Sequence, residues 1–114
     1  MRNFLFATIL AATAASPAFA TQGMICSGKG ASVEMLFGHA AVAALVGAQF
    51  EVDGAAVPSA VARNWLDEKQ MMIDFADPDQ MALIASLRLT WHKPEWRGTF
   101  TYKGRKIALR CEEG

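Results

Sequence analysis

The sequence predicts a mainly β protein: a small antiparallel sandwich or barrel with a terminal disulfide and one short helix around residues 78–86. Apolar and polar residues alternate through most of the chain, which is the period-two pattern of half-buried strands. Turn-forming pairs such as Asp53-Gly54 and Lys103-Gly104 separate the alternating runs at short intervals. Short strands at this spacing, with neighbours paired, are typical of small antiparallel sandwiches and barrels.

The first twenty residues have the pattern of a secretory signal peptide. Arg2 precedes an almost wholly apolar stretch, and Ala18-Phe19-Ala20 supplies the small residues that a signal peptidase reads. We therefore expect residues 1–20 to be removed and residues 21–114 to form one exported domain, periplasmic or secreted. The apolar stretch reaches the length of a membrane anchor, about 20 residues, only if Ser16 and Pro17 are counted. No membrane span is expected after cleavage.

The charge balance bears on the kind of partner. The chain has 11 basic and 11 acidic residues, and Arg2 leaves with the signal, so the exported domain has a small acidic excess. Nucleic-acid-binding domains usually carry a basic excess. The sequence therefore predicts no nucleic-acid partner.

Cys26 and Cys111 are the two cysteines of the chain, one near each end of the exported domain. An even number of cysteines in an oxidising compartment indicates a disulfide. Neither cysteine belongs to a Cys-x-x-Cys pair, so a structural bridge is favoured over a redox or metal site. The chain-entropy model assigns such a bridge about 4.6 kcal/mol of stabilisation, and Cα atoms about 4.4–6.8 Å apart are expected.

The first half of the domain contains two predicted strands. Residues 32–37 alternate, with Val33, Met35 and Phe37 on one side. Residues 40–46 fit a helix or a strand, and the pattern does not decide between them. From Val46 onward the period of two favours a strand that directs one set of side chains inward: Val46, Ala48, Phe50 and Val52.

The middle of the chain contains two further strands and the predicted helix. Residues 62–66 and 70–75 alternate on either side of a turn at residues 67–69, with Met71, Ile73 and Phe75 facing inward. Asp77-Pro78 has the form of a helix start, an N-cap aspartate followed by a proline at the first helical position. We expect one or two helical turns and then a strand from about Leu87.

The last segment has the strongest hairpin pattern. Two alternating runs, residues 96–102 and 106–111, flank Lys103-Gly104. Their alternation predicts that Phe100, Ile107 and Leu109 are in the core. The same alternation directs three basic side chains to solvent: Arg97, Lys106 and Arg110.

The charges are divided along the chain. Residues 51–79 are rich in acids and residues 88–110 are rich in bases. Two interpretations remain open: the two sets are ordinary solvated faces or pair with each other, or the bases form a face that binds an anionic partner.

The loop between Trp91 and Trp96 contains the candidate partner-binding residues. Two tryptophans flank a short charged loop, and an exposed ring beside such a loop is a frequent anchor for a partner. Together with the basic strand residues, the candidate set is Trp91, His92, Trp96, Arg97 and Lys106. The expected partner is an unknown protein or an anionic envelope component.

The sequence contains no clear catalytic, cofactor-binding or metal-binding pattern. Asp74, Asp77 and Asp79 are close together, but Pro78 and Gln80 break the calcium-loop pattern, and a solvated turn with a helix cap accounts for them. A small hydrolase using one of these aspartates with His39 or His92 is the alternative from another class.

The leading function is therefore a non-catalytic periplasmic binding or inhibitor-type module. A signal, one terminal disulfide and a β-rich body are similar in outline to small exported inhibitor and binding domains, although such an analogy says little about function. The other alternative is an accessory subunit without activity of its own.

Overall fold

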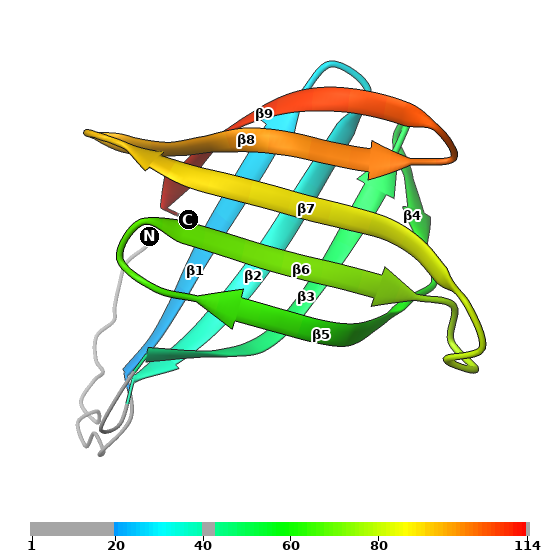
Figure 1. Ribbon diagram of the computed structural model, residues 1–114, viewed down its shortest axis with the longest axis horizontal. Coiled ribbons are helices and arrows are strands. Elements are labelled where there is room, and N and C mark those ends of the chain that lie inside the picture. The colour runs from blue at the N-terminus through cyan, green and yellow to red at the C-terminus, as the bar shows by residue number, and fades with distance from the viewer. Residues whose placement is uncertain (1–19, 40–42, 114) are drawn as a thin grey trace, which may run out of the picture.

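The computed structural model describes residues 20–39 and 43–113, and in these residues every regular element is a strand (Figure 1). The expected signal therefore lies, apart from Ala20, outside the described residues. The strand bounds are as follows: β1 (Ala20–Gly28), β2 (Ala31–His39), β3 (Ala43–Val52), β4 (Ala55–Val57), β5 (Ala60–Leu66), β6 (Gln70–Ala76), β7 (Leu83–His92), β8 (Glu95–Tyr102) and β9 (Arg105–Glu113).

All the described strands belong to one antiparallel sheet, in the order β4-β3-β2-β1-β9-β8-β7-β6-β5. Within this sheet, all pairings except one join strands that follow each other in the chain. The exception is β1 with β9, which joins the two ends of the described chain in the middle of the sheet. The fold is thus two meanders, β1–β4 and β5–β9, joined by one long-range pairing.

The sheet curls into a half-barrel, so that the two meanders face each other. In Figure 1, β1, β2 and β3 lie behind β5, β6 and β7 and cross them obliquely. The edge strands β4 and β5 follow each other in the chain, linked through residues 58 and 59, yet they lie at opposite ends of the strand order. Contact between β3 and β5 brings these edges together.

The core fills the space between the two layers. Phe50 of β3 packs against Phe75 of β6 and Phe100 of β8, with ring centroids 4.9 and 5.0 Å apart. Burial of Phe100, Ile107 and Leu109 confirms the predicted inward face of the last hairpin. The antiparallel β-rich fold predicted from the alternation is therefore confirmed.

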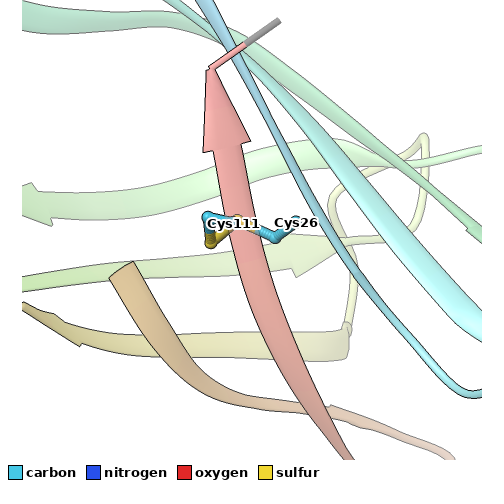
Figure 2. The surroundings of a disulfide bond; sticks show 2 residues. All are labelled: Cys26 and Cys111. Carbon is cyan, nitrogen blue, oxygen red and sulfur yellow. A yellow bond between two sulfur atoms is a disulfide. The ribbon is translucent and has the colours of Figure 1, made fainter. Parts of the chain in front are cut away.

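The predicted disulfide between Cys26 and Cys111 is present and joins β1 to β9 (Figure 2). The two residues lie directly opposite each other in the strand register. Their Cα atoms are 3.8 Å apart, which is below the expected range of about 4.4–6.8 Å.

The two predicted turns have the backbone that their sequences favour. Asp53 and Gly54 have φ values of 53° and 85°, and Lys103 and Gly104 have values of 50° and 79°. Positive φ at both central residues is typical of the type I′ turns that connect two-residue hairpins.

The predicted helix around residues 78–86 is wrong, because the segment forms a tight loop followed directly by β7. Asp77 does act as a cap: its Oδ1 accepts a hydrogen bond of 2.8 Å from the Met81 amide. However, Gln80 has a φ of 59°, which is incompatible with a continuing helix. The alternation that buries Ala85 and Leu87 then favours a strand. The described residues contain no helix that is long and apolar enough to span a membrane.

The ambiguous segment 40–46 is a strand from Ala43, and residues 40–42 lie outside the described residues. Val46 was expected to face inward but is 67% exposed. The register explains the difference: Phe37 pairs with Leu45 and Leu36 with Gly47, so the two strands shift by one residue at this point. Such a bulge interrupts the alternation, and Val46 is turned outward.

Two glycines in strands offer a matched test of packing. A Cβ added at Gly98 would lie 1.9 Å from the Arg88 carbonyl oxygen, whereas one at Gly47 would have no neighbour within 4 Å. We predict that Gly98→Ala lowers the free energy of unfolding by about 2–3 kcal/mol, the scale of an overpacked site. Gly47→Ala should leave it unchanged or slightly raised, since alanine loses less backbone entropy. Urea denaturation measures both, and equal effects would contradict the assigned packing.

A second prediction concerns the disulfide. Replacing both cysteines by alanine should lower the free energy of unfolding by about 2–5 kcal/mol, because the bridge restricts the unfolded chain. Reduction of the native protein by a thiol should have the same effect in urea denaturation. Unchanged stability in both experiments would mean that the pairing of β1 with β9 does not need the bond.

Candidate functional site

Among the described residues, one charged side chain is buried: Asp74, with only 5% of its surface exposed. It lies in β6 between Ile73 and Phe75, both of which point into the core. Strand alternation therefore directs Asp74 to the outer face of the sheet. A carboxylate is rarely this buried unless other groups cover it and compensate its charge.

Two arginines cover this carboxylate. Nε of Arg63 donates to Oδ2 of Asp74, and Nη1 of Arg88 donates to Oδ1 at 2.8 Å. The Arg88 Nη1 also donates to the Leu87 carbonyl oxygen at 2.9 Å. Both oxygens of one buried carboxylate are thus bound to cationic donors.

Strand register places these side chains together. Arg63 of β5 lies opposite Asp74, and Arg88 of β7 lies opposite Met72, the next outward residue of β6. A register shift between Val61 and Arg63 inserts one residue into β5. Without this bulge, Ala62 would lie opposite Asp74, so the bulge aims Arg63 at the carboxylate.

The arginines keep Asp74 ionised. Burial alone would raise the pKa of this carboxyl, but the hydrogen bonds and positive charges of Arg88 and Arg63 outweigh burial and lower the pKa below 3.8. Asp74 is therefore an anion at neutral pH and fixes both guanidinium groups beside it.

A shallow groove of about 620 Å³ lies on the outer face above this cluster. We name it the arginine groove and define it by six of its lining residues, which come from β5 to β8 and the turn that follows: Arg63, Asp74, Ser86, Arg88, Thr101 and Lys103. Ser86 lies opposite both Asp74 and Thr101, and Thr101 lies opposite Lys106. The row that crosses five neighbouring strands is therefore Arg63, Asp74, Ser86, Thr101 and Lys106, with hydroxyl and basic side chains on every strand except β6.

The groove is positive and rich in donors. Three bases of the arginine groove face one acid, and Lys106 adds a further base at the end of the row. Each guanidinium uses one nitrogen to bind Asp74. The side chains of Arg63 and Arg88 remain 71% and 47% exposed. Their other N–H groups and the hydroxyls of Ser86 and Thr101 are suited to bind an anion.

The candidate residues of the Trp91–Trp96 loop differ in how firmly the fold holds them. Trp91 and Trp96 pack against each other, whereas His92 is exposed. The two tryptophan rings pack edge to face with centroids 5.5 Å apart, and Trp96 packs against the core. Trp91 is 44% exposed, but its amide donates to the Lys69 carbonyl oxygen at 2.9 Å. His92 is exposed and bonds to Thr90, with 2.7 Å between Nε2 and Oγ1.

Arg97 and Lys106 are exposed as predicted but do not lie at one site. Arg97 pairs with Glu95, which also binds Arg110, at 3.1 and 2.9 Å. Lys106 lies opposite Thr101, four residues along β8 from Arg97, which corresponds to about 13 Å. Lys106 therefore belongs to the row of the arginine groove, and Arg97 belongs to the loop end.

The aspartates and the histidine of the alternative hydrolase do not come together to form a catalytic site within the described residues. The interpretation of Asp74 as a solvated turn residue is wrong, since it is buried in β6, while Asp77 caps the loop and Asp79 is exposed. His92 lies six residues along β7 from Ser86, the neighbour of Asp74, or about 20 Å. The side chain of His39 lies outside what the structure describes. Among the described residues, no three His, Cys, Asp or Glu side chains gather in a way that would hold a metal ion.

The acid-rich and base-rich segments make contact at two points. Asp74 binds Arg88, and Asp53 binds Arg105 at 3.1 Å. The remaining ion pairs each join two residues of the same segment. The two segments thus pair in part, and an excess of bases remains around the groove.

Sequence reasoning missed Arg63, Arg88 and the role of Asp74. One signal was present: a single aspartate inside the apolar run of residues 71–76 requires a cationic partner if that run is a strand. The identity of the partners depended on the register and the bulge, which the sequence pattern did not contain.

No protein-family model, curated protein or solved structure matches this chain. The site is therefore interpreted from its own chemistry.

The lowered pKa of Asp74 predicts a particular acid response. A group whose pKa is lower in the folded protein contributes stability above its unfolded pKa, near 3.8, and this contribution is lost as the pH falls through the folded value. At pH 7, Asp74→Asn should therefore lower the free energy of unfolding by about 1–2 kcal/mol, a modest loss because the side chains of Arg63 and Arg88 are 71% and 47% exposed. Denaturation curves recorded from pH 7 into acid should show the two proteins converging as Asp74 becomes protonated. The control Asp79→Asn, at an exposed loop position, should follow the native protein across this pH range.

Proposed function

We propose that this domain is a non-catalytic binding module that recognises an anionic ligand in the arginine groove. The observation that carries the proposal is the placement of two arginines on one buried carboxylate, with N–H groups left over at an open groove. The expected export of the domain makes an anionic component of the cell envelope the natural class of ligand.

A purely structural ion pair explains less of this arrangement. One arginine with good geometry would compensate the single negative charge of Asp74. Two arginines leave the cluster positive, and Lys103 and Lys106 add to that charge without a carboxylate partner among the described ion pairs. Like charges near one another are unfavourable in an empty groove, and an anion would relieve the repulsion.

Asp74 supports binding by fixing the donors. A free arginine side chain loses up to about 2 kcal/mol of rotamer entropy when it is immobilised. Because both guanidinium groups are already held by Asp74, less of that cost remains at the moment of binding. The rigid strands beneath them fix the spacing between the donors.

The test uses inorganic polyphosphate as a simple polyanion, with affinity measured by isothermal titration at two salt concentrations. Arg63→Gln and Arg88→Gln should each weaken binding about tenfold, equivalent to about 1.4 kcal/mol. Lys106→Gln should weaken binding less and should reduce its dependence on salt. The unfolding free energy of each variant is measured in parallel to exclude loss of the fold.

Arg97→Gln is the matched control, because it removes the same charge from the same sheet at the loop end. It should leave the affinity for polyphosphate nearly unchanged. If Arg97→Gln weakens binding as much as Arg88→Gln does, the binding surface is the Trp91–Trp96 loop instead. Absence of binding to any polyanion, or binding that is insensitive to both groove arginines, would contradict the proposal.

A further inference from the structure

Trp65 is an exposed aromatic residue on the same face as the arginine groove. It lies in β5, two residues from Arg63, and it is 53% exposed. In the register it lies opposite Met72, which in turn lies opposite Arg88. Trp65, Arg63 and Arg88 therefore point to one side of the sheet.

The Trp65 ring is held by its polar edge. Nε1 donates to Oδ2 of Asp67 at 2.8 Å. The other oxygen of Asp67 accepts from the amides of Lys69 and Gln70, each at 2.8 Å. The hydrogen bond from Trp65, followed by these two amide bonds, lowers the pKa of Asp67, so the anchor is a carboxylate at neutral pH. An indole whose N–H is satisfied still leaves its apolar face to solvent.

The spacing fits a ligand that combines a flat apolar surface with a negative group. The backbone positions of Trp65 and Arg63 are about 7 Å apart along β5, and those of Trp65 and Arg88 are about 10 Å apart across two strand spacings. A sugar ring that packs its C–H face on Trp65 can extend a carboxylate or phosphate substituent to the guanidinium groups. Ser86 and Thr101, which also line the groove, offer hydroxyl groups to the polar positions of further sugars.

We infer that the ligand of the groove is an acidic oligosaccharide, bound by Trp65 through a sugar ring and by Arg63 and Arg88 through its anionic substituent. This inference rests on the proposed function and adds the chemical class of the ligand. A nucleic acid offers stacking bases and phosphates as well, but successive bases need successive aromatic side chains to stack on. Trp65 is the exposed tryptophan that the described residues place beside the groove arginines.

The test compares four probes with the native protein and its variants: a galacturonic acid hexamer, the neutral maltohexaose, polyphosphate and a short single-stranded oligothymidine. The galacturonate hexamer should bind, and maltohexaose should bind at least tenfold more weakly. Trp65→Ala should weaken galacturonate binding about tenfold and leave polyphosphate binding unchanged. Trp65→Phe should restore much of the loss, since it keeps an aromatic face.

Trp91→Ala is the matched control, because Trp91 is similarly exposed but lies at the loop end. It should leave the affinity for both anions unchanged. If Trp65→Ala leaves galacturonate binding unchanged, or if oligothymidine binds more tightly than galacturonate with the same dependence on Trp65, the inference is overturned. In either case, polyphosphate binding that depends on Arg63 and Arg88 would still support the proposed function, so the two failures are distinguishable.

Discussion

The pairing of β1 with β9 is the interaction on which the rest of the fold depends. Every other pairing of the described strands joins neighbours in the chain and needs only a short connection. The pairing of β1 with β9 joins positions 85 residues apart, where the entropy of closing the chain is largest. Without it, two separate meanders would each expose an apolar face. The Cys26–Cys111 bond lies in this one long-range ladder and ties it covalently.

Closure of the sheet leaves one face for packing and the other open to solvent. Phe50 from the first meander meets Phe75 and Phe100 from the second, so the inner face is fully used by the core. The outer face of β5 to β8 then presents its polar side chains at spacings fixed by strand register. The binding surface that we propose is built on strands, which are more rigid than loops and favour preorganised recognition.

Patterns in the sequence predicted those parts of the fold that are determined by residues close together in the chain or by the oxidising compartment. The two turns at Asp53 and Lys103, the inward face of the last hairpin and the cysteine pair all follow from neighbouring residues or from compartment chemistry. The helix failed because the cap at Asp77 is the same in a tight loop as in a helix, and the strand pattern after it decided the outcome. The inward placement of Val46 was wrong, and the role of Arg63 was missed, for another reason: bulges shift the alternation by one residue, and neither bulge has a clear sequence signal. The arginine groove combines side chains from four strands, so its composition emerged only when the register was known.

The position of the disulfide also determines how the domain carries force. Cys26 and Cys111 lie near the two ends of the described chain, so tension applied there passes from one strand to its neighbour through the sulfur atoms. The hydrogen-bonded strands between them lie outside this path and are not loaded. The oxidised domain is therefore nearly inextensible between residues 26 and 111. After reduction, the same tension would act on the ladder of β1 and β9 and could release 85 residues of chain, an extension of roughly 280–300 Å.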